Sequence, residues 1–546
     1  MGENVASFVG SVLAELGVGH AFGVVGSGNF HVTNALRGNG VPFTAARHEG
    51  GAAAMTDGYS RLASLPGVLT LHQGCGLTNA MTGIAEAAKS RTPMIVLTAD
   101  TAGAAVNSNF RIDTGGLVAS VGAVPERVYT AGSAVADVVR AYKTAVHGRR
   151  TVVVSLPLDV QAAPADPVPS LPPLVPPAPV RPAASAVVEF VDLLAAAERP
   201  VFVAGRGGRT AGPRIAALAY KAGALLATSA VANGLFEGEE FGLGISGGFS
   251  TPLAAELISG ADLIVGWGCA LNMWTMRHGT LIGERAKVVQ VDDDQAAIGA
   301  HRPVDLGILG DCAATAADTL TALGPAEEKR GYRTPEIRER LAAGRWWNDV
   351  PTEDLGTDDR VDPREFTKAL DEALPAERIV AIDSGNFMGY PSAYLRVPDE
   401  FGFCFTQAFQ SIGLGLSSGI GAGLAKPDRL AVVGTGDGGF LMAISELETA
   451  VRLGKPMVVA VYNDAAYGAE VHHFGAGADL GAVTFPDTDI AAIARGFGAE
   501  GVTVRGTGDM RAVASWAAKP SGVLVIDAKI ASDGGSWWLA EAFRGH

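Results

Sequence analysis

A carboxylate inside a glycine turn is the sharpest chemical signal in the sequence. The turn Gly434-Thr-Gly-Asp-Gly-Gly439 follows the apolar run 430–433 and precedes the helical pattern 445–453. Backbone N–H groups of such a turn form a ready site for a phosphate group. Asp437 within the turn would repel that anion unless a divalent cation lay between them. The sequence therefore predicts a metal and diphosphate site here.

A second oxygen ligand is expected from the strand that follows. The apolar run 457–461 ends in Tyr462-Asn463-Asp464, and Asp464 stands 27 residues after Asp437, the length of one helix-and-strand crossover. Asp464 is a hard oxygen ligand of the kind that magnesium prefers. If the loop is shifted by one residue, Asn463 takes its place.

Together the two segments resemble the diphosphate–magnesium motif of thiamine-diphosphate enzymes, the family of acetolactate synthase, pyruvate decarboxylase and benzoylformate decarboxylase. The resemblance implies metal ligation by Asp437, by Asp464 (where the family usually has Asn) and by the backbone carbonyl of Ala466. It also implies a backbone contact from the loop 383–387 and a bulky aliphatic side chain, Ile412, beneath the bent cofactor. The implied cofactor-binding residues are Gly385, Asn386, Ile412, Gly436, Asp437, Gly438, Gly439, Asp464, Ala466 and Tyr467.

A catalytic glutamate is implied by the segment 46–61, which resembles the family's glutamate-bearing segment and places Glu49 in that role. The cofactor must lose its C2 proton, and a carboxyl group hydrogen-bonded to its pyrimidine ring promotes this loss. Taken alone, Glu49 would equally suit the first turn of an Ala-rich helix. The diphosphate motif favours the catalytic role.

The substrate pocket is expected from four short segments. His72 stands where benzoylformate decarboxylase has a histidine, and Ser27 resembles its substrate-contacting serine. Glu470 aligns with a glutamate that pyruvate decarboxylases use for proton transfer, so His72 or Glu470 would protonate the product. The implied catalytic residues are Glu49, His72 and Glu470, and the implied substrate contacts are Ser27, Gln73, Phe110 and Arg111.

Each of these assignments has a simpler alternative. His72 lies beside glycines and would be satisfied by hydrogen bonds to the backbone alone. Arg111 suits the carboxylate of an acceptor, or else an ordinary surface ion pair.

The resemblance implies decarboxylation of a 2-oxo acid with transfer of the acyl carbanion to a carbonyl acceptor, as in acetolactate synthase. One alternative is a simple decarboxylase that releases an aldehyde, and a remote one is a non-catalytic cofactor-binding homologue. FAD is a further candidate cofactor beside thiamine diphosphate and Mg²⁺, because acetolactate synthases bind it in the middle unit and Gly205–Gly208 would suit a nucleotide. The run that those enzymes use is replaced here by Gly268–His278.

Two other enzyme classes fit less of the sequence. A dinucleotide-dependent oxidoreductase matches the glycine turn 434–439 but leaves Glu49 and Asp464 without a role. A serine hydrolase matches Gly244-Ile-Ser-Gly-Gly248, yet no convincing buried strand precedes this pentapeptide.

The elements that must position these residues are short aliphatic runs alternating with Ala-rich helical segments, a pattern typical of buried parallel strands with crossover helices. The predicted strands are 67–71, 94–97, 151–155, 200–203, 263–265, 288–291, 379–382, 430–433, 457–461 and 522–526.

Two interruptions divide the chain into three α/β domains with parallel sheets flanked by helices. Nine prolines make 164–182 an extended linker, and the charged segment 326–360 should cross between domains. The domains are then 1–163 (pyrimidine-binding), 183–325 (central) and 361–546 (diphosphate-binding).

Composition excludes several partners. The 546 residues carry a net charge of −15 and no Lys/Arg-rich block, which argues against nucleic acid and anionic membranes. No apolar run reaches about 18 residues and no basic leader is present, so a cytoplasmic location is expected. The four scattered cysteines are expected to be buried thiols. The resemblance implies a homodimer at least, and favours a homotetramer, with active sites between subunits that take a small 2-oxo acid.

Overall fold

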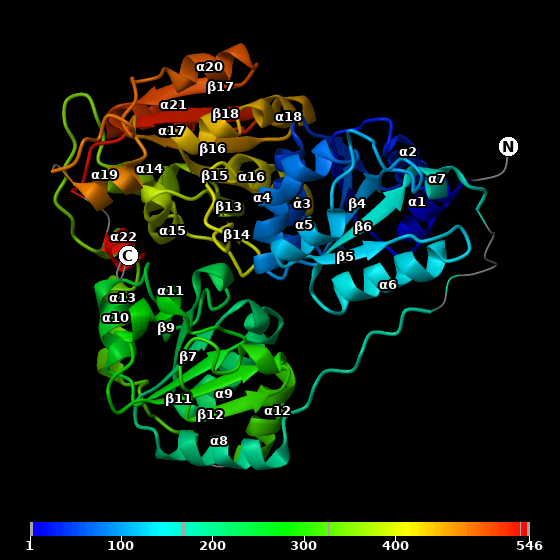
Figure 1. Ribbon diagram of the computed structural model, residues 1–546. Helices are drawn as coiled ribbons and strands as arrows, with labels where there is room; N and C mark the ends of the chain where they lie inside the picture. The colour runs from blue at the N-terminus through cyan, green and yellow to red at the C-terminus, as the bar shows by residue number, and fades with distance from the viewer. Residues whose placement is uncertain are drawn as a thin grey trace.

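The computed structural model describes residues 4–165, 171, 173–325, 328–475, 477–534 and 537–542. Figure 1 shows three domains along the chain: an N-terminal domain in blue and cyan, a central domain in green and a C-terminal domain in yellow to red. Each contains one six-stranded sheet in which all strand pairs are parallel. Every run predicted as a strand lies in one of these sheets, and the expected architecture is confirmed.

The N- and C-terminal sheets have the same strand order. The N-terminal order is β2-β1-β3-β4-β6-β5 and the C-terminal order is β14-β13-β15-β16-β18-β17. The N-terminal strands are β1 (His20–Gly23), β2 (Phe43–Ala45), β3 (Gly67–Leu71), β4 (Met94–Asp100), β5 (Val124–Arg127) and β6 (Thr151–Pro157). The C-terminal strands are β13 (Arg378–Ile382), β14 (Phe403–Phe405), β15 (Leu430–Gly436), β16 (Met457–Asn463), β17 (Glu500–Val504) and β18 (Val523–Lys529).

These two domains share a hydrophobic core through a helix pair, α3 (Glu49–Leu62) and α16 (Gly415–Ala425), which lie side by side in Figure 1. Glycines make the close approach possible. A Cβ on Gly421 would lie 1.9 Å from the carbonyl oxygen of Met55, and one on Gly58 would lie 2.3 Å from that of Ser418.

The central sheet has the order β12-β11-β10-β7-β8-β9. Its strands are β7 (Pro200–Ala204), β8 (Leu225–Thr228), β9 (Gly242–Ile245), β10 (Leu263–Trp267), β11 (Lys287–Asp292) and β12 (Leu306–Leu309). The order reverses between β7 and β10, the place where α/β sheets of this kind bind nucleotides.

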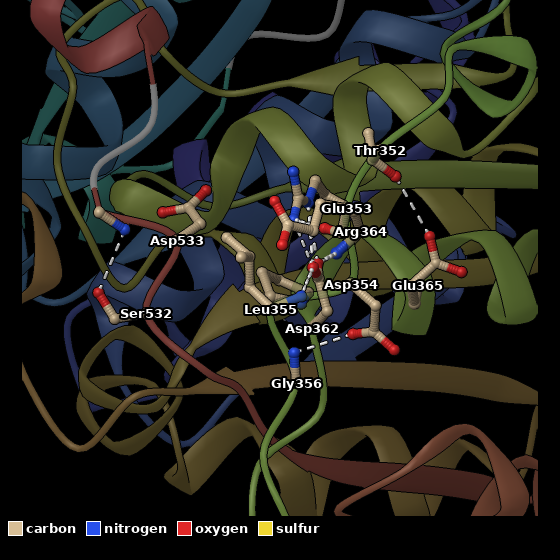
Figure 2. Close-up of polar contacts among 12 residues, drawn as sticks. Thr352, Glu353, Asp354, Leu355, Gly356, Asp362, Arg364, Glu365, Ser532 and Asp533 are labelled. Atoms are coloured by element: carbon tan, nitrogen blue, oxygen red, sulfur yellow. Dashed lines mark hydrogen bonds and ion pairs between the residues drawn. The ribbon is translucent and has the colours of Figure 1, made fainter.

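The segment expected to cross between the central and C-terminal domains contains a helix. Within 328–360, α13 (Pro335–Gly344) buries Ile337 and Leu341 in the core of the central domain. The chain then reaches α14 (Pro363–Ala373), whose N-cap Asp362 accepts hydrogen bonds from the backbone N–H of Leu355 and from Arg364, as Figure 2 shows. This cap fixes the entry into the C-terminal domain.

The Pro-rich linker has no helix or strand between residues 173 and 183, whereas residues 166–170 and 172 lie outside the described part of the chain. No helix among the described residues is long and apolar enough to span a membrane. Cys269, Cys312 and Cys404 are buried, but Cys75 is exposed. The expectation of four buried thiols was therefore wrong for Cys75, because it begins α4 (Cys75–Lys89) at the open carboxyl edge of the N-terminal sheet.

Candidate active site

Two carboxylates meet at the carboxyl edge of the C-terminal sheet. Asp437 begins α17 (Asp437–Met442) directly after β15, and Asp464 follows the neighbouring strand β16. Asp437 is 7% exposed and its side chain shares a hydrogen bond with Asp464. Desolvation raises the pKa of Asp437 to about 6, and desolvation together with the charge of Asp437 raises the pKa of Asp464 to about 7. A divalent cation between them would stabilise both carboxylates.

Asn463 faces away from this pair. Its Nδ2 donates to Asp527 Oδ1 at 2.8 Å, and its Oδ1 accepts the backbone N–H of Ala465 at 3.1 Å. Ala465 has a φ of +57°, so the backbone turns sharply after the strand. The turn leaves the side chain of Asp464, and not that of Asn463, facing Asp437.

The loop after β16 is closed by its own backbone. The N–H of Ala466 donates to Asp464 Oδ1 at 3.2 Å. Ala466 and Thr484 form an isolated antiparallel bridge, and the hydrogen bonds of this bridge are made by the neighbouring residues, from Tyr467 to Val483 and from Phe485 to Ala465. Tyr467 covers the glycine turn, where a Cβ on Gly438 would lie 2.7 Å from its Cε1.

Among the described residues, no group of three or more His, Cys, Asp or Glu side chains is placed to hold a metal ion. A cation between Asp437 and Asp464 would therefore need the carbonyl of Ala466, or oxygens of a bound phosphate, to complete its shell. The donor set fits a hard cation such as Mg²⁺.

Asp383, directly after β13, fixes the loop that carries Ile412. Its carboxylate accepts the N–H groups of Gly413 (3.0 Å) and Leu414 (3.2 Å) and the hydroxyl of Thr435 (3.0 Å). Desolvation raises the pKa of Asp383 to about 6, although these hydrogen bonds act to lower it. Ile412 is half-buried just before α16.

Asn386, preceded by Gly385, lies near Asp464. Gly385 has a φ of +141° and precedes a 3₁₀ turn that begins at Asn386. A Cβ on Gly468 would lie 2.3 Å from Asp464 Oδ2 and 3.2 Å from Asn386 Cβ, so both side chains border this glycine. The remaining turn glycines are also crowded, Gly436 against Phe387 and Gly439 against Asp383.

Glu49 is the first residue of α3 and is half-buried. Asn79 Nδ2, on α4, donates to its Oε2 at 3.0 Å. A Cβ on Gly76 would lie 3.7 Å from Glu49 Oε1 and 3.4 Å from His72 Cβ. The small glycine therefore lies between Glu49 and His72.

His72 and Gln73 lie against a glycine loop that carries Ser27. The N–H of Gly28 donates to His72 Nδ1 at 3.2 Å, so a neutral His72 carries its proton on Nε2. The His72 ring packs edge-on against Phe110, with centroids 5.2 Å apart. Gln73 is 6% exposed, and its Oε1 has no hydrogen-bond partner among the described residues.

The predicted site residues therefore form two groups. Ser27, Glu49, His72, Gln73 and Phe110 belong to the N-terminal group, beyond which Arg111 is exposed. The C-terminal group surrounds Asp437 and Asp464, with Glu470 half-buried on α19 (Gly468–Phe474). Within the described part of the chain, no hydrogen bond or ion pair joins a residue of one group to a residue of the other.

Large apolar side chains are exposed on the segments that carry both groups. Phe30 is 51% exposed and Met442 is 56% exposed. The others are Val25, Val106 and Phe110 in the N-terminal domain and Phe409, Leu441, Phe474 and Phe485 in the C-terminal domain.

Two cations near the carboxylate pair had no role in the sequence-based prediction. Lys529, at the end of β18, is 2% exposed, and its charge lowers the pKa of Asp437. Arg360 donates to the carbonyl of Asn463 at 3.1 Å, and its charge lowers the pKa of Asp464. Lys529 could have been found from the sequence, because it ends an apolar run that forms a strand. Arg360 could not, because it lies in a loop whose sequence shows no periodic pattern.

The nucleotide-binding position of the central sheet is closed by backbone contacts. The N–H of Gly205 donates to the carbonyl of Trp267 at 2.9 Å, and that of Gly207 to Gly268 at 3.1 Å. A Cβ on Gly205 would lie 2.3 Å from the carbonyl oxygen of Gly268. The glycines after β7 therefore pack against the loop after β10, and their geometry does not fit a phosphate between them.

Comparison with known proteins places all three domains of the chain in one family. Three models match: the N-terminal TPP binding domain of thiamine pyrophosphate enzymes (residues 3–115), their central domain (187–323) and their C-terminal TPP binding domain (383–528).

Relatives match over most of their length. A protein named probable 2-ketoarginine decarboxylase from Pseudomonas aeruginosa is 30% identical, over 84% of this chain and 81% of its own. A sulfoacetaldehyde acetyltransferase from Alcaligenes xylosoxydans xylosoxydans is 26% identical (91% and 87%), and an acetolactate synthase from Bacillus subtilis is 27% identical (96% and 93%). The chain therefore belongs to the thiamine pyrophosphate-dependent enzymes.

Proposed function

We propose that the chain decarboxylates a 2-oxo acid and transfers the resulting acyl group to a carbonyl acceptor, with thiamine diphosphate and Mg²⁺ as cofactors. The observation that carries the proposal is the facing pair Asp437 and Asp464 at the glycine turn. In this proposal the metal ligands are Asp437, Asp464 and the carbonyl of Ala466. Bound thiamine diphosphate supplies a nucleophilic carbon for the substrate carbonyl and an electron sink for the release of CO₂.

Glu49 is proposed to activate the cofactor. Its carboxyl group would hydrogen-bond the pyrimidine ring, and Asn79 orients the carboxyl by donating to Oε2. Ile412 and Tyr467 would hold the bent cofactor above the glycine turn.

His72 is proposed as a proton donor to the product, because Gly28 holds Nδ1 as an acceptor and leaves the proton on Nε2. Glu470, in the C-terminal group, is the other proposed proton donor. Gln73 and Ser27 would contact the substrate, and Arg111 beyond Phe110 would bind the carboxylate of an acceptor.

The second candidate is a decarboxylase that releases an aldehyde. The proton on His72 Nε2 favours it, as does the relative named as a 2-ketoarginine decarboxylase. The relatives named as an acetyltransferase and as a synthase favour acyl transfer.

We also propose a homodimer as the smallest active form and a homotetramer as the favoured one. No hydrogen bond or ion pair joins the two groups of site residues within the described part of one chain, and exposed apolar side chains border each group. A second copy that brought its N-terminal group to this chain's carboxylate pair would cover these side chains. Because the central nucleotide position is closed, we propose that the protein binds no FAD, which a featureless absorbance spectrum near 450 nm would support.

The test supplies purified protein with Mg²⁺, thiamine diphosphate and one 2-oxo acid at a time: pyruvate, benzoylformate or 2-ketoarginine. CO₂, aldehyde and acyloin are followed by mass spectrometry, with and without an added aldehyde acceptor. Acyloin as the main product supports the proposal, and aldehyde alone supports the second candidate. Cofactor binding without CO₂ from any 2-oxo acid would contradict both.

A further inference from the structure

The N- and C-terminal domains repeat one plan, and the repeat relates their functional helices. In each domain the edge strand (β2 or β14) leads into the helix of the shared core (α3 or α16), and the third strand of the domain (β3 or β15) leads into the next helical segment. That segment is α4 in the N-terminal domain and α17 with α18 (Ser445–Leu453) in the C-terminal domain. Each segment contains one glutamate that is 1% exposed.

Glu446, on α18, binds the segment that enters α3. Its Oε1 accepts the backbone N–H groups of His48 at 2.8 Å and Arg47 at 3.1 Å. Its Oε2 accepts the hydroxyl of Thr449 at 2.7 Å. The next residue in the chain is Glu49, so the carboxylate of Glu446 fixes the backbone immediately before it.

Glu86, on α4 of the N-terminal domain, binds a backbone segment of the C-terminal domain in the same way. Its carboxylate accepts the backbone N–H groups of Phe409 at 2.6 Å and Ala408 at 3.1 Å, in the segment between β14 and α16. Arg61 holds Glu86 in place at 2.7 Å. The segment so fixed carries Ile412 three residues later.

We propose that Glu446 and Glu86 are reciprocal positioning residues. Each is a buried glutamate of one domain that accepts two backbone N–H groups of the other domain, shortly before the residue proposed to face the cofactor. Glu446 thereby positions Glu49, and Glu86 positions Ile412. The inference rests on the proposed roles of Glu49 and Ile412. It also makes the chain a link between two active sites of a dimer, because Glu446 lies nine residues after Asp437 in sequence while Glu49 would serve the partner's cofactor.

The physical basis is the strength of these hydrogen bonds. A carboxylate that accepts two amide N–H groups makes charge-assisted bonds, about twice as strong as neutral ones. Oε2 of Glu446 also accepts the backbone N–H of Arg47, at 3.2 Å. In Glu446→Gln an amide NH₂ group takes the place of Oε2 and faces this N–H, which leaves a buried donor without its acceptor. The segment Arg47-His48 would then shift, and Glu49 with it.

Glu446→Gln tests the inference, with Glu448→Gln as the matched control. Glu448 lies on the same helix and pairs with the Arg47 side chain at 2.6 Å, but it does not touch the Arg47 or His48 backbone. In protein without cofactor, amide hydrogen exchange of Arg47 and His48 should be about tenfold faster in Glu446→Gln and unchanged in the control. With saturating cofactor and Mg²⁺, exchange of the C2 proton should slow by about tenfold while cofactor affinity stays within about threefold.

Glu446→Asp keeps the negative charge but shortens the side chain by one methylene. We expect an intermediate effect on amide hydrogen exchange and on the C2 exchange rate. This variant replaces Glu446→Gln in the test if the glutamine variant does not fold. Unchanged exchange of the Arg47 and His48 amides, or an unchanged C2 rate, in a folded Glu446 variant would overturn the inference. The proposed function would be contradicted by a different result, a normal rate of C2 proton exchange in Glu49→Gln. For the reciprocal half, Glu86→Gln should speed exchange of the Ala408 and Phe409 amides and leave those of Arg47 and His48 unchanged.

Discussion

Glu49 is the residue whose replacement should separate cofactor binding from cofactor activation. In Glu49→Gln the Asn79 hydrogen bond can be kept, since the amide oxygen still accepts from Nδ2. The proposed diphosphate and metal contacts lie in the other group and would be untouched. We therefore expect cofactor affinity within about threefold of wild type, and a C2 exchange rate lower by about 100-fold or more, measured by NMR in deuterated buffer. An unchanged exchange rate would remove Glu49 from the mechanism.

Asp437 should decide whether the metal and diphosphate bind at all. Thiamine diphosphate with Mg²⁺ is expected to raise the melting temperature of the wild-type protein, because a ligand that binds only the folded state stabilises it. EDTA should abolish the rise, and Asp437→Ala should show none. Asp464→Asn keeps an oxygen ligand and should retain the rise. A full thermal shift in Asp437→Ala would place the metal elsewhere.

At the scale of elements, glycines at the crossing of α3 and α16 determine how the two outer domains dock. Gly421→Ala would place a methyl group 1.9 Å from the Met55 carbonyl oxygen, a contact that only a movement of backbone relieves. We expect destabilisation of about 2–3 kcal/mol or more, measured by the urea midpoint. Gly38→Ala, at the end of α2 (Phe30–Gly38) with nothing within 4 Å of the new Cβ, should be neutral or slightly stabilising. Equal effects would contradict close docking.

The edge strand that leads toward Glu49 contains a pH-sensitive contact. His20 on β1 hydrogen-bonds Thr44 on β2 at 2.8 Å, and burial lowers its pKa to about 4. In the unfolded chain His20 binds a proton near pH 6.5, whereas in the folded protein it stays neutral until about pH 4. The free energy of unfolding therefore keeps the full contribution of neutral His20 above about pH 6.5. It falls by on the order of 3 kcal/mol in total as the pH drops toward about 4.

His20→Gln keeps a partner for Thr44 but cannot titrate, so its melting temperature should fall less between pH 7 and pH 5 than that of the wild type. The exposed His31 provides the control, and His31→Gln should follow the wild type. Identical pH profiles for wild type and His20→Gln would show that His20 is not the titrating group.

The sequence predicted the strands that carry chemistry because they are long, apolar and buried on both faces, as β15 and β16 are. It did not predict eight shorter strands of three to five residues each, β1, β2, β5, β8, β9, β12, β14 and β17. The Asp437–Asp464 pair was predictable because one crossover connects them. The bonds of Glu446 to Arg47 and His48 span some 400 residues, and no local pattern in a single sequence encodes such a pairing.

At the scale of the whole molecule, one chain carries both proposed halves of an active site, and no hydrogen bond or ion pair joins the two among the described residues. The shared core of the outer domains holds the two halves at fixed positions. In the proposed dimer a second copy would supply the missing half of each site. It would also cover the valine and phenylalanine side chains exposed on the N-terminal segments and the phenylalanine, leucine and methionine side chains exposed on the C-terminal ones.

Mixing two inactive variants tests whether the active sites form between two chains. Glu49→Gln and Asp437→Ala are each expected to lack C2 exchange, the first in activation and the second in cofactor binding. If sites form between chains, a hybrid dimer has one site with a native Glu49 and a native Asp437.

After the two variants are unfolded and refolded together, random pairing should therefore restore about a quarter of the wild-type C2 exchange. If Glu49 instead serves the Asp437 of its own chain, every site in the hybrid carries one defect. A mixture that refolds into dimers, contains both chains and shows no exchange above the separate variants would contradict the account.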